Sequence, residues 1–267
     1  MGQDELGGSP QLRVSVSRAR IQIGELSLDS LTREGAIEAV AELVRDGRGG
    51  TVFTPNVDHI VQAEHDAAFR AAYGRTELSF VDGTPVLWAA RLLGTPLPAK
   101  LSGSDLFEPL LERAEREGWR VVLLGGGPGV AEQAATNLRQ RMPALQIVDT
   151  LAPRLGIEPD ENERECVERL ARASAQLIFV CLGAPKQELF SDRNRSRLAP
   201  AVLVGFGAAV DFAAGTVPRA PAWMSRAGLE WAFRLGREPR RLAARYLLRD
   251  PEFLKIVATQ AFSRRSD

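Results

Sequence analysis

Short apolar runs alternate with stretches of helical spacing along most of this chain. The apolar runs predict strands at 51–54, 78–81, 120–124, 145–149, 177–182 and 201–205, after an earlier short strand at 21–28. Helical spacing predicts helices at 31–45, 57–73, 85–93, 104–117 and 160–173, and one more that ends near Arg141. Because the strands lack polar alternation and helices separate them, we predict an α/β fold with a parallel, Rossmann-like sheet and helices on both faces.

The last fifty residues follow a different pattern. Leu229, Phe233 and Leu235 predict an amphipathic helix, and Pro239 is expected to start a second one after a bend. Two nearly coaxial helices would place one set of arginines along one side: Arg234, Arg237, Arg241, Arg245 and Arg249. We therefore predict three parts: a loose N-terminal segment (1–20), an α/β catalytic domain (21–218) and a basic helical C-terminal appendage (219–267).

Charge distribution adds to this division. The 267 residues carry 34 basic and 34 acidic side chains, so the formal net charge is zero. Residues 1–218 hold 23 basic and 29 acidic side chains, whereas residues 219–267 hold 11 basic and 5 acidic ones. A cationic tail on an acidic body can meet phosphates, an anionic membrane surface or the body itself.

Cysteine content and hydropathy indicate the compartment. Cys166 and Cys181 lack the spacing of a structural zinc site, and two such thiols fit a reducing cytoplasm. The first ten residues lack a signal-peptide pattern, and no apolar run approaches the roughly 18–20 residues of a membrane span. We expect a cytoplasmic chain that does not cross a membrane.

Polar and glycine clusters follow five of the predicted strands. Ligands of open α/β sheets bind beyond the carboxyl ends of the strands, so these clusters predict one ligand site. Its candidate segments are Thr54 with Asn56, Asp82, Gly125–Gly129, Gly183–Glu188 and Gly205–Asp211.

The glycine loop after strand 120–124 resembles a dinucleotide-binding turn. Asp149 ends the next strand about 20 residues later, where a ribose-binding acid would lie. The third glycine of the G-x-G-x-x-G pattern is replaced by Val130, however. Gly125 and Gly127 therefore have two further interpretations: backbone binding of a diphosphate at a helix start, or a tight turn only.

The remaining candidates each have a structural alternative. Asp82 is expected to be partly buried at a strand end, where it could act as a general base or be a turn aspartate. Thr54 and Asn56 could contact a sugar or cap a helix. Lys186 lies in the first turn of a helix, where a bound phosphate would offset the unfavourable helix dipole; a solvated lysine is the alternative. Asp211 needs a partner, either Arg219 or a ligand.

Metal binding is not expected. His59 and His65 are six residues apart and do not share a helix face, and the sequence contains no D-x-D pair. A nucleotide-sugar enzyme of this kind would neutralise its departing diphosphate with Lys, Arg and helix N-termini.

Taken in order, the motifs resemble the WecG/TagA/CpsF family of bacterial glycosyltransferases over roughly residues 20–255. The matching segments are Thr54–Asn56, Asp82–Gly83, Ser102–Phe107, Gly125–Gly129, Gly183–Glu188, Gly205–Phe212, Arg219–Trp223, Gly228–Trp231, Glu238–Leu242 and Arg245–Leu247. One stretch departs: Thr150–Gly156 replaces the His-Gly-Tyr-Phe-like segment of many members, which leaves the donor sugar undetermined.

The resemblance implies an inverting, metal-independent transfer without a cofactor. A sugar, N-acetylmannosamine-type or another hexose, would move from a UDP-sugar to an undecaprenyl-diphosphate-linked sugar in cell-surface polysaccharide or teichoic acid synthesis. It implies a protein associated peripherally with the inner face of the membrane. A homo-oligomer is possible, and no nucleic-acid partner is expected.

The resemblance also implies roles for single residues. The family's general base falls on Asp82, its substrate contacts on Thr54, Asn56 and Gln187, and its nucleotide-contacting aspartate on Asp211. Lys100 matches a basic residue that is often arginine, and the C-terminal arginines match Arg234, Arg241 and Arg245. Two alternatives remain: an NAD-dependent oxidoreductase, and a non-catalytic scaffold that binds membranes through its tail.

Overall fold

The computed structural model describes residues 19–221, 224, 230–237, 239 and 250–266. Its centre is a six-stranded parallel sheet in the order β4-β3-β8-β7-β5-β6. The strands are β3 (Gly50–Phe53), β4 (Leu78–Ser79), β5 (Arg120–Gly125), β6 (Gln146–Leu151), β7 (Leu177–Cys181) and β8 (Val202–Gly205). The predicted α/β class and parallel sheet are confirmed.

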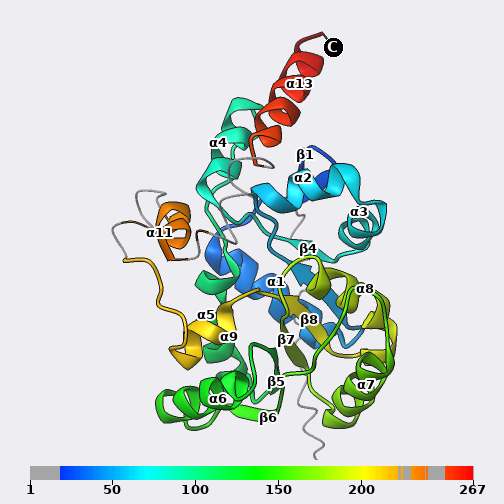
Figure 1. Cartoon of the computed structure of the whole chain (residues 1–267), viewed down its shortest axis with the longest axis vertical. Helices are drawn as coiled ribbons and strands as arrows, with labels where there is room; N and C mark the ends of the chain where they lie inside the picture. The colour runs from blue at the N-terminus through cyan, green and yellow to red at the C-terminus, as the bar shows by residue number, and fades with distance from the viewer. Residues whose placement is uncertain (1–18, 222–223, 225–229, 238, 240–249, 267) are drawn as a thin grey trace, which may run out of the picture.

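Helices cover both faces of this sheet (Figure 1), and the central strands β7 and β8 are apolar and buried along their whole length. Val121 and Leu123 of β5 pack into one core cluster, whereas Val122 and Leu124 pack into the opposite one. The first cluster is closed by α1 (Arg33–Asp46), α5 (Gly103–Glu117), α6 (Val130–Arg141) and α9 (Ala209–Ala214). The second is closed by α7 (Glu161–Ala173) and α8 (Lys186–Leu198).

A third core cluster lies at one end of the molecule. It is formed by the antiparallel hairpin β1 (Arg20–Ile23) and β2 (Leu26–Asp29) together with α2 (Val57–His65), α3 (Ala67–Gly74) and α4 (Thr84–Leu92). The prediction of one strand at 21–28 was wrong, because Gly24, with φ +55°, turns the chain. The prediction of one helix at 57–73 was also wrong, because the Asp66 side chain accepts from the backbone N–H of Phe69 (2.9 Å) and starts a new helix there.

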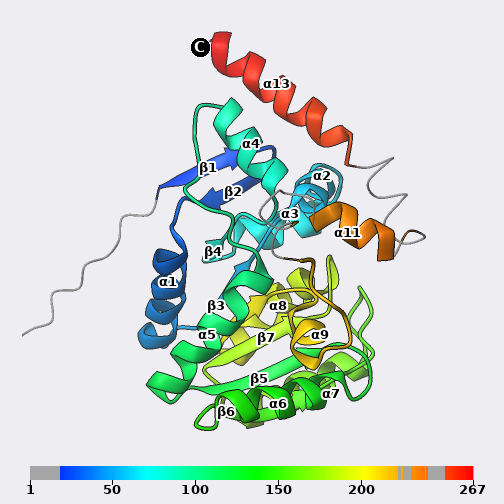
Figure 2. The same ribbon diagram turned by 90° about the vertical axis from the view of Figure 1, so that its left-hand side faces the viewer.

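Two helices of the C-terminal part are described. A helix, α11 (Glu230–Arg237), lies where the amphipathic helix was predicted, and α13 (Glu252–Ser266) was not predicted. Leu229 and residues 240–249, where a second helix was expected after Pro239, lie outside the described residues. Figure 2 shows α13 at the end of the molecule that holds the β1–β2 hairpin and α4. Phe253 and Val257 are buried there, and the Gln260 side chain bonds Gly24 N (3.0 Å) and Gln22 O (2.8 Å). The boundary at 218/219 stays a prediction, but α13 packs on the N-terminal hairpin.

None of the helices in the described ranges combines the length and the apolar composition needed to cross a membrane.

Candidate active site

Two loops meet where β3 and β4 end. Thr54–Asn56 follows β3, and Asp82 lies just after β4. The backbone N–H of Asp82 donates to the carbonyl oxygen of Pro55 at 2.9 Å, and Phe80 donates to Phe53 at 2.9 Å, which extends the parallel pairing past the strands. Thr54 is buried and Asp82 is half-buried. The predicted base and the Thr-Pro-Asn segment therefore form one unit.

Asn56 also starts a helix. Its side-chain oxygen accepts from the backbone N–H of His59 at 3.3 Å, which makes it the N-cap of α2. The capping alternative is confirmed for this residue, and a sugar contact through Asn56 stays a prediction.

Lys100 lies beside this unit. Leu101 N–H donates to Val81 O at 2.8 Å, which brings the segment against the Asp82 loop. Lys100 Nζ is 3.2 Å from Asp105 Oδ2 at the start of α5. Burial acts to raise the pKa of Asp105, but the Ser102 hydroxyl and the cations of Lys100 and Arg219 lower it below its ordinary value. Arg219, one predicted partner for Asp211, makes its ion pair with Asp105 at 3.1 Å.

The glycine loop brings the end of β5 against β7. Gly125 has φ +122°, and a Cβ at this position would lie 2.1 Å from the carbonyl oxygen of Cys181. Gly126 N–H donates to that same oxygen at 3.3 Å. A close approach of the two strands therefore requires glycine at position 125. Gly127 lies in the exposed part of the loop ahead of α6, and diphosphate binding there stays a prediction.

Asp211 lies over the same strand ends. A Cβ on Gly126 would be 3.8 Å from Asp211 Oδ1. Burial raises the pKa of the Cys181 thiol to about 12, and the nearby Asp211 carboxylate adds to this effect. Asp211 therefore lies near the glycine loop, as a nucleotide contact would.

Lys186 is directed to a loop. Its ammonium group donates to the carbonyl oxygen of Leu155 at 2.9 Å, so that the start of α8 is joined to the segment after β6. Leu155 belongs to Thr150–Gly156, the stretch that departs from the family pattern. The lysine is half-buried and bonded to this carbonyl, which disfavours the alternative of a solvated side chain, and phosphate binding by Lys186 stays a prediction.

Gln187 connects the two groups of loops. Its Oε1 accepts from the backbone N–H of Gly207 at 3.0 Å, and its Nε2 donates to Glu188 Oε1 at 2.8 Å. A Cβ on Gly205, at the end of β8, would lie 3.3 Å from Gln187 Nε2 and 3.1 Å from the Phe53 ring of β3. Gln187 therefore lies where the β3 side and the β7–β8 side of the site meet.

Sequence reasoning did not assign a role to three buried residues behind the site. Glu188 is fully buried, and its Oε1 lies 3.9 Å from His59 Nδ1. The same His59 atom is 2.8 Å from the Tyr73 hydroxyl. Burial raises the pKa of Glu188 to about 7, with Asp58 adding to the shift and the Gln187 hydrogen bond opposing it.

Asp149 is not at the carboxyl end of its strand. It lies within β6, opposite Val122 of β5, and not at the end of a strand as predicted. Arg169 of α7 binds it in bidentate fashion, with Nε 2.7 Å from Oδ2. An acid held in this ion pair is not placed to bind a ribose.

Only some of the predicted acceptor- or membrane-binding arginines belong to the described residues. Arg237 lies on α11 with its guanidinium 5.7 Å from the Phe233 ring centroid. Arg234 lies on the same helix, but its side chain is outside the description, and Arg241 and Arg245 lie outside the described residues. Acceptor or membrane contact by these arginines stays a prediction.

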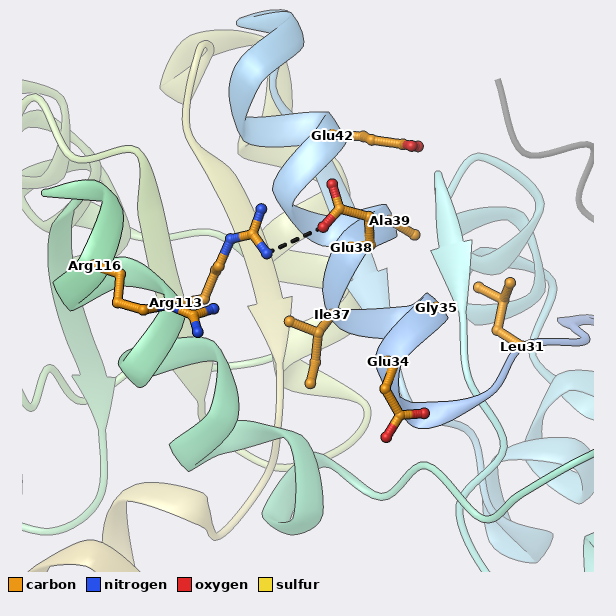
Figure 3. Close-up of a pocket in the computed structure, with 9 residues that line it drawn as sticks. All are labelled: Leu31, Glu34, Gly35, Ile37, Glu38, Ala39, Glu42, Arg113 and Arg116. Carbon is orange, nitrogen blue, oxygen red and sulfur yellow. Dashed lines mark ion pairs between the residues drawn. The ribbon is translucent and has the colours of Figure 1, made fainter. Parts of the chain in front are cut away.

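A groove of about 500 Å³ lies elsewhere, between α1 and α5 (Figure 3). Leu31, Ile37 and Arg116 line it together with Glu38 and Arg113, whose ion pair measures 3.1 Å. None of the predicted site residues lines this groove, and within the described ranges no three His, Cys, Asp or Glu side chains gather as a metal site would require.

The glycine and polar loops lie at the carboxyl ends of a parallel sheet, which is where open α/β proteins bind their ligands. The model of the Glycosyl transferase WecG/TagA/CpsF family matches residues 21–267, and the chain belongs to this family of glycosyltransferases. It is similar to the N-acetylglucosaminyldiphosphoundecaprenol N-acetyl-beta-D-mannosaminyltransferase of Bacillus spizizenii, with 29% identity over 210 residues, 79% of each chain. Family membership favours a transferase over the oxidoreductase and scaffold alternatives.

Proposed function

We propose that this chain transfers N-acetylmannosamine or a related hexose from a UDP-sugar to a polyprenyl-diphosphate-linked sugar. The transfer inverts the anomeric carbon, uses no metal, and serves cell-surface polysaccharide or teichoic acid synthesis. The similar Bacillus enzyme is named for a mannosaminyl transfer to a diphosphoundecaprenol-linked sugar, which supports both the sugar type and the acceptor class.

One contact supports the assignment of the base: the hydrogen bond from Asp82 N–H to Pro55 O. It holds the backbone at Asp82 against the Thr54–Asn56 segment. In the proposed mechanism, Thr54 and Asn56 orient the acceptor sugar. Asp82 takes the proton from the acceptor hydroxyl as its oxygen attacks the anomeric carbon. The bond from that carbon to UDP breaks, UDP leaves with the electron pair, and Asp82 then gives the proton to solvent.

Donor binding falls to the other loops. Backbone N–H groups of the Gly125–Gly129 turn, with Gly125 and Gly127 keeping the backbone open, meet the diphosphate at the start of α6. Lys100, Lys186 and Gln187 stabilise the charge that develops on the departing diphosphate, and Asp211 binds the nucleotide.

The acceptor's lipid stays in the bilayer, so the enzyme works at the inner face of the cell membrane as a peripheral protein. Arg234, Arg237, Arg241 and Arg245 bind anionic head groups or the acceptor diphosphate. The positive balance of residues 219–267 supports this arrangement.

The direct test is a panel of UDP-sugars offered with a short-chain lipid-diphosphate-N-acetylglucosamine acceptor, in buffer with and without EDTA. We expect one UDP-N-acetylhexosamine to give a β-linked disaccharide product at the same rate in both buffers. No transfer from any donor would refute the proposed activity, and loss of transfer in EDTA would refute metal independence.

A further inference from the structure

Glu188 is an acid in an unusual position. It lies in the first turn of α8 with no solvent exposure. Its Oε1 accepts one hydrogen bond, from Gln187, and Oε2 has no hydrogen-bond partner within the described part of the chain. A buried carboxylate is costly unless both oxygens are satisfied, so the presence of an acid here calls for an explanation.

The contact with Gln187 has only one possible orientation. A backbone N–H can only donate, so the Gln187 oxygen must face Gly207 and its NH₂ group must face Glu188. Without an acceptor at Glu188 Oε1, this NH₂ group would lose its partner and the amide would be free to turn. Gly207 belongs to the turn between β8 and α9, the helix that carries Asp211.

Glu188 also faces the opposite side of the site. Its Oε1 is 3.9 Å from His59 Nδ1, which is hydrogen-bonded to the Tyr73 hydroxyl. Burial is the main cause of the raised pKa of Tyr73, and the carboxylates of Glu188 and Asp82 raise it further. The Tyr73 hydroxyl therefore lies within electrostatic range of both carboxylates. His59 follows the Asn56 cap by three residues.

We propose that Glu188 is a positioning residue for sugar transfer. It holds the Gln187 amide, and through it the turn that leads to Asp211, at a fixed place relative to the His59–Tyr73 pair and the Asp82 loop. Glu188 touches neither substrate. The inference rests on the proposed transferase activity, because it assigns Glu188 to the alignment of the donor side with the base side.

Two substitutions distinguish a requirement for the length of the Glu188 side chain from a requirement for its charge. Glu188→Gln keeps an oxygen at the distance of Gln187 Nε2 but removes the ionisable group, whereas Glu188→Asp keeps the carboxyl group and withdraws it by one methylene. Ser191→Ala is the matched control, because Ser191 is fully buried one turn further along α8 and its hydroxyl has no hydrogen-bond partner in the described ranges.

We expect kcat of Glu188→Asp to fall about tenfold to a hundredfold, as for a misplacement of about 1 Å, with Glu188→Gln and Ser191→Ala within about threefold of the parent chain. Normal kcat in Glu188→Asp would overturn the proposal. An equal loss in Glu188→Gln would overturn it too, because an acid would then be needed for its charge.

Hydrogen exchange measured on the full chain gives a readout that does not depend on activity. We expect faster exchange in residues 205–212 of Glu188→Asp, with Glu188→Gln and Ser191→Ala unchanged. Unchanged exchange in Glu188→Asp would overturn the positioning role. If the parent chain transferred no sugar but the variants still showed this exchange pattern, the proposed activity would be refuted. The link from Glu188 to the Gly207 turn would then remain supported.

Discussion

The backbone N–H of Asp82 donates a 2.9 Å hydrogen bond to the carbonyl oxygen of Pro55. Because β3 and β4 are parallel neighbours at one side of the sheet, this bond fastens the loops that follow them to each other. The backbone at Asp82 is thereby held against the segment that carries Thr54, and such fixed loops are what the proposed preorganised site needs.

Two threonines near each other in sequence should separate function from stability. We expect Thr54→Val to reduce transfer about tenfold and leave the free energy of unfolding nearly unchanged, because the proposed role of its hydroxyl is to orient the acceptor. Thr51→Val should instead cost about 1–2 kcal/mol of stability, because the Thr51 hydroxyl bonds that of Thr76 (3.0 Å) in the core.

Urea denaturation and steady-state transfer assays on both variants check this pair. A destabilised Thr54→Val with normal kcat would assign Thr54 to packing and remove it from the site.

Gly125 should tolerate no side chain. We expect Gly125→Ala to destabilise the fold by about 3 kcal/mol or more, because its Cβ would lie 2.1 Å from backbone and its φ of +122° is strained for alanine. Gly47→Ala is the control: Gly47 has φ +64° and open space around it, so about 1 kcal/mol is expected. Equal midpoints in urea for the two variants would contradict the close approach of β5 and β7.

The stability of the chain should depend on pH through Glu188. The folded-state pKa of about 7 lies above the ordinary value of 4.5, so the folded chain holds this proton more tightly than the unfolded chain. Tighter proton binding by Glu188 adds about 3 kcal/mol to the free energy of unfolding below pH 4.5. This stabilisation is lost as the pH rises through about 7.

Unfolding free energies from pH 5 to 8 should therefore fall less steeply in Glu188→Gln than in the parent chain. The exposed Glu158→Gln serves as a control and should follow the parent curve. Parallel curves for all three proteins would show that Glu188 titrates normally.

Membrane binding should depend on the tail arginines. Reversal of charge at Arg241 and Arg245 should weaken binding to anionic liposomes, with each lost basic residue costing about 1 kcal/mol, and the deficit should shrink as salt is added. Arg172→Glu, on α7, is the control, because Figure 1 shows α7 at the end of the molecule away from α13. Equal liposome binding by all of these proteins would favour packing of the tail arginines against the acidic body.

Local patterns determined how much of the fold could be predicted. The uninterrupted apolar residues Val121–Leu124 marked a strand buried on both faces, and the structure divides them between two core clusters. Periodicity could not show that Asp149 lies within β6, since the pairing with β5 sets where that strand ends. The fold of α13 onto the hairpin depends on contacts between residues more than 230 positions apart, such as Gly24 and Gln260.

In the candidate site, too, local features could be predicted from the sequence, whereas features that depend on contacts between distant segments could not. Residues that follow strands, such as Asp82 and Asp211, could be proposed from the sequence because parallel strands bring their carboxyl ends to one side of the sheet. Glu188 belongs to a predicted segment, but its burial and its role could not be predicted, because residues 187–191 of α8 are buried in succession and give no amphipathic signal. Its significance comes from α2 and α3, which bring His59 and Tyr73 to it from more than 100 residues away.

The rate of a single turnover by Asp82→Asn tests the central claim most directly. Parent and variant are loaded with the active UDP-sugar and mixed with the lipid-diphosphate acceptor, while UDP affinity and the thermal midpoint are measured in parallel. Asp66→Asn is the control. It makes the same change at a carboxylate outside the site, and asparagine can still cap α3 there. We expect Asp82→Asn to turn over about 10²–10⁴-fold more slowly with UDP binding and folding intact; a rate within about threefold of the parent would contradict the assignment of Asp82 as the general base.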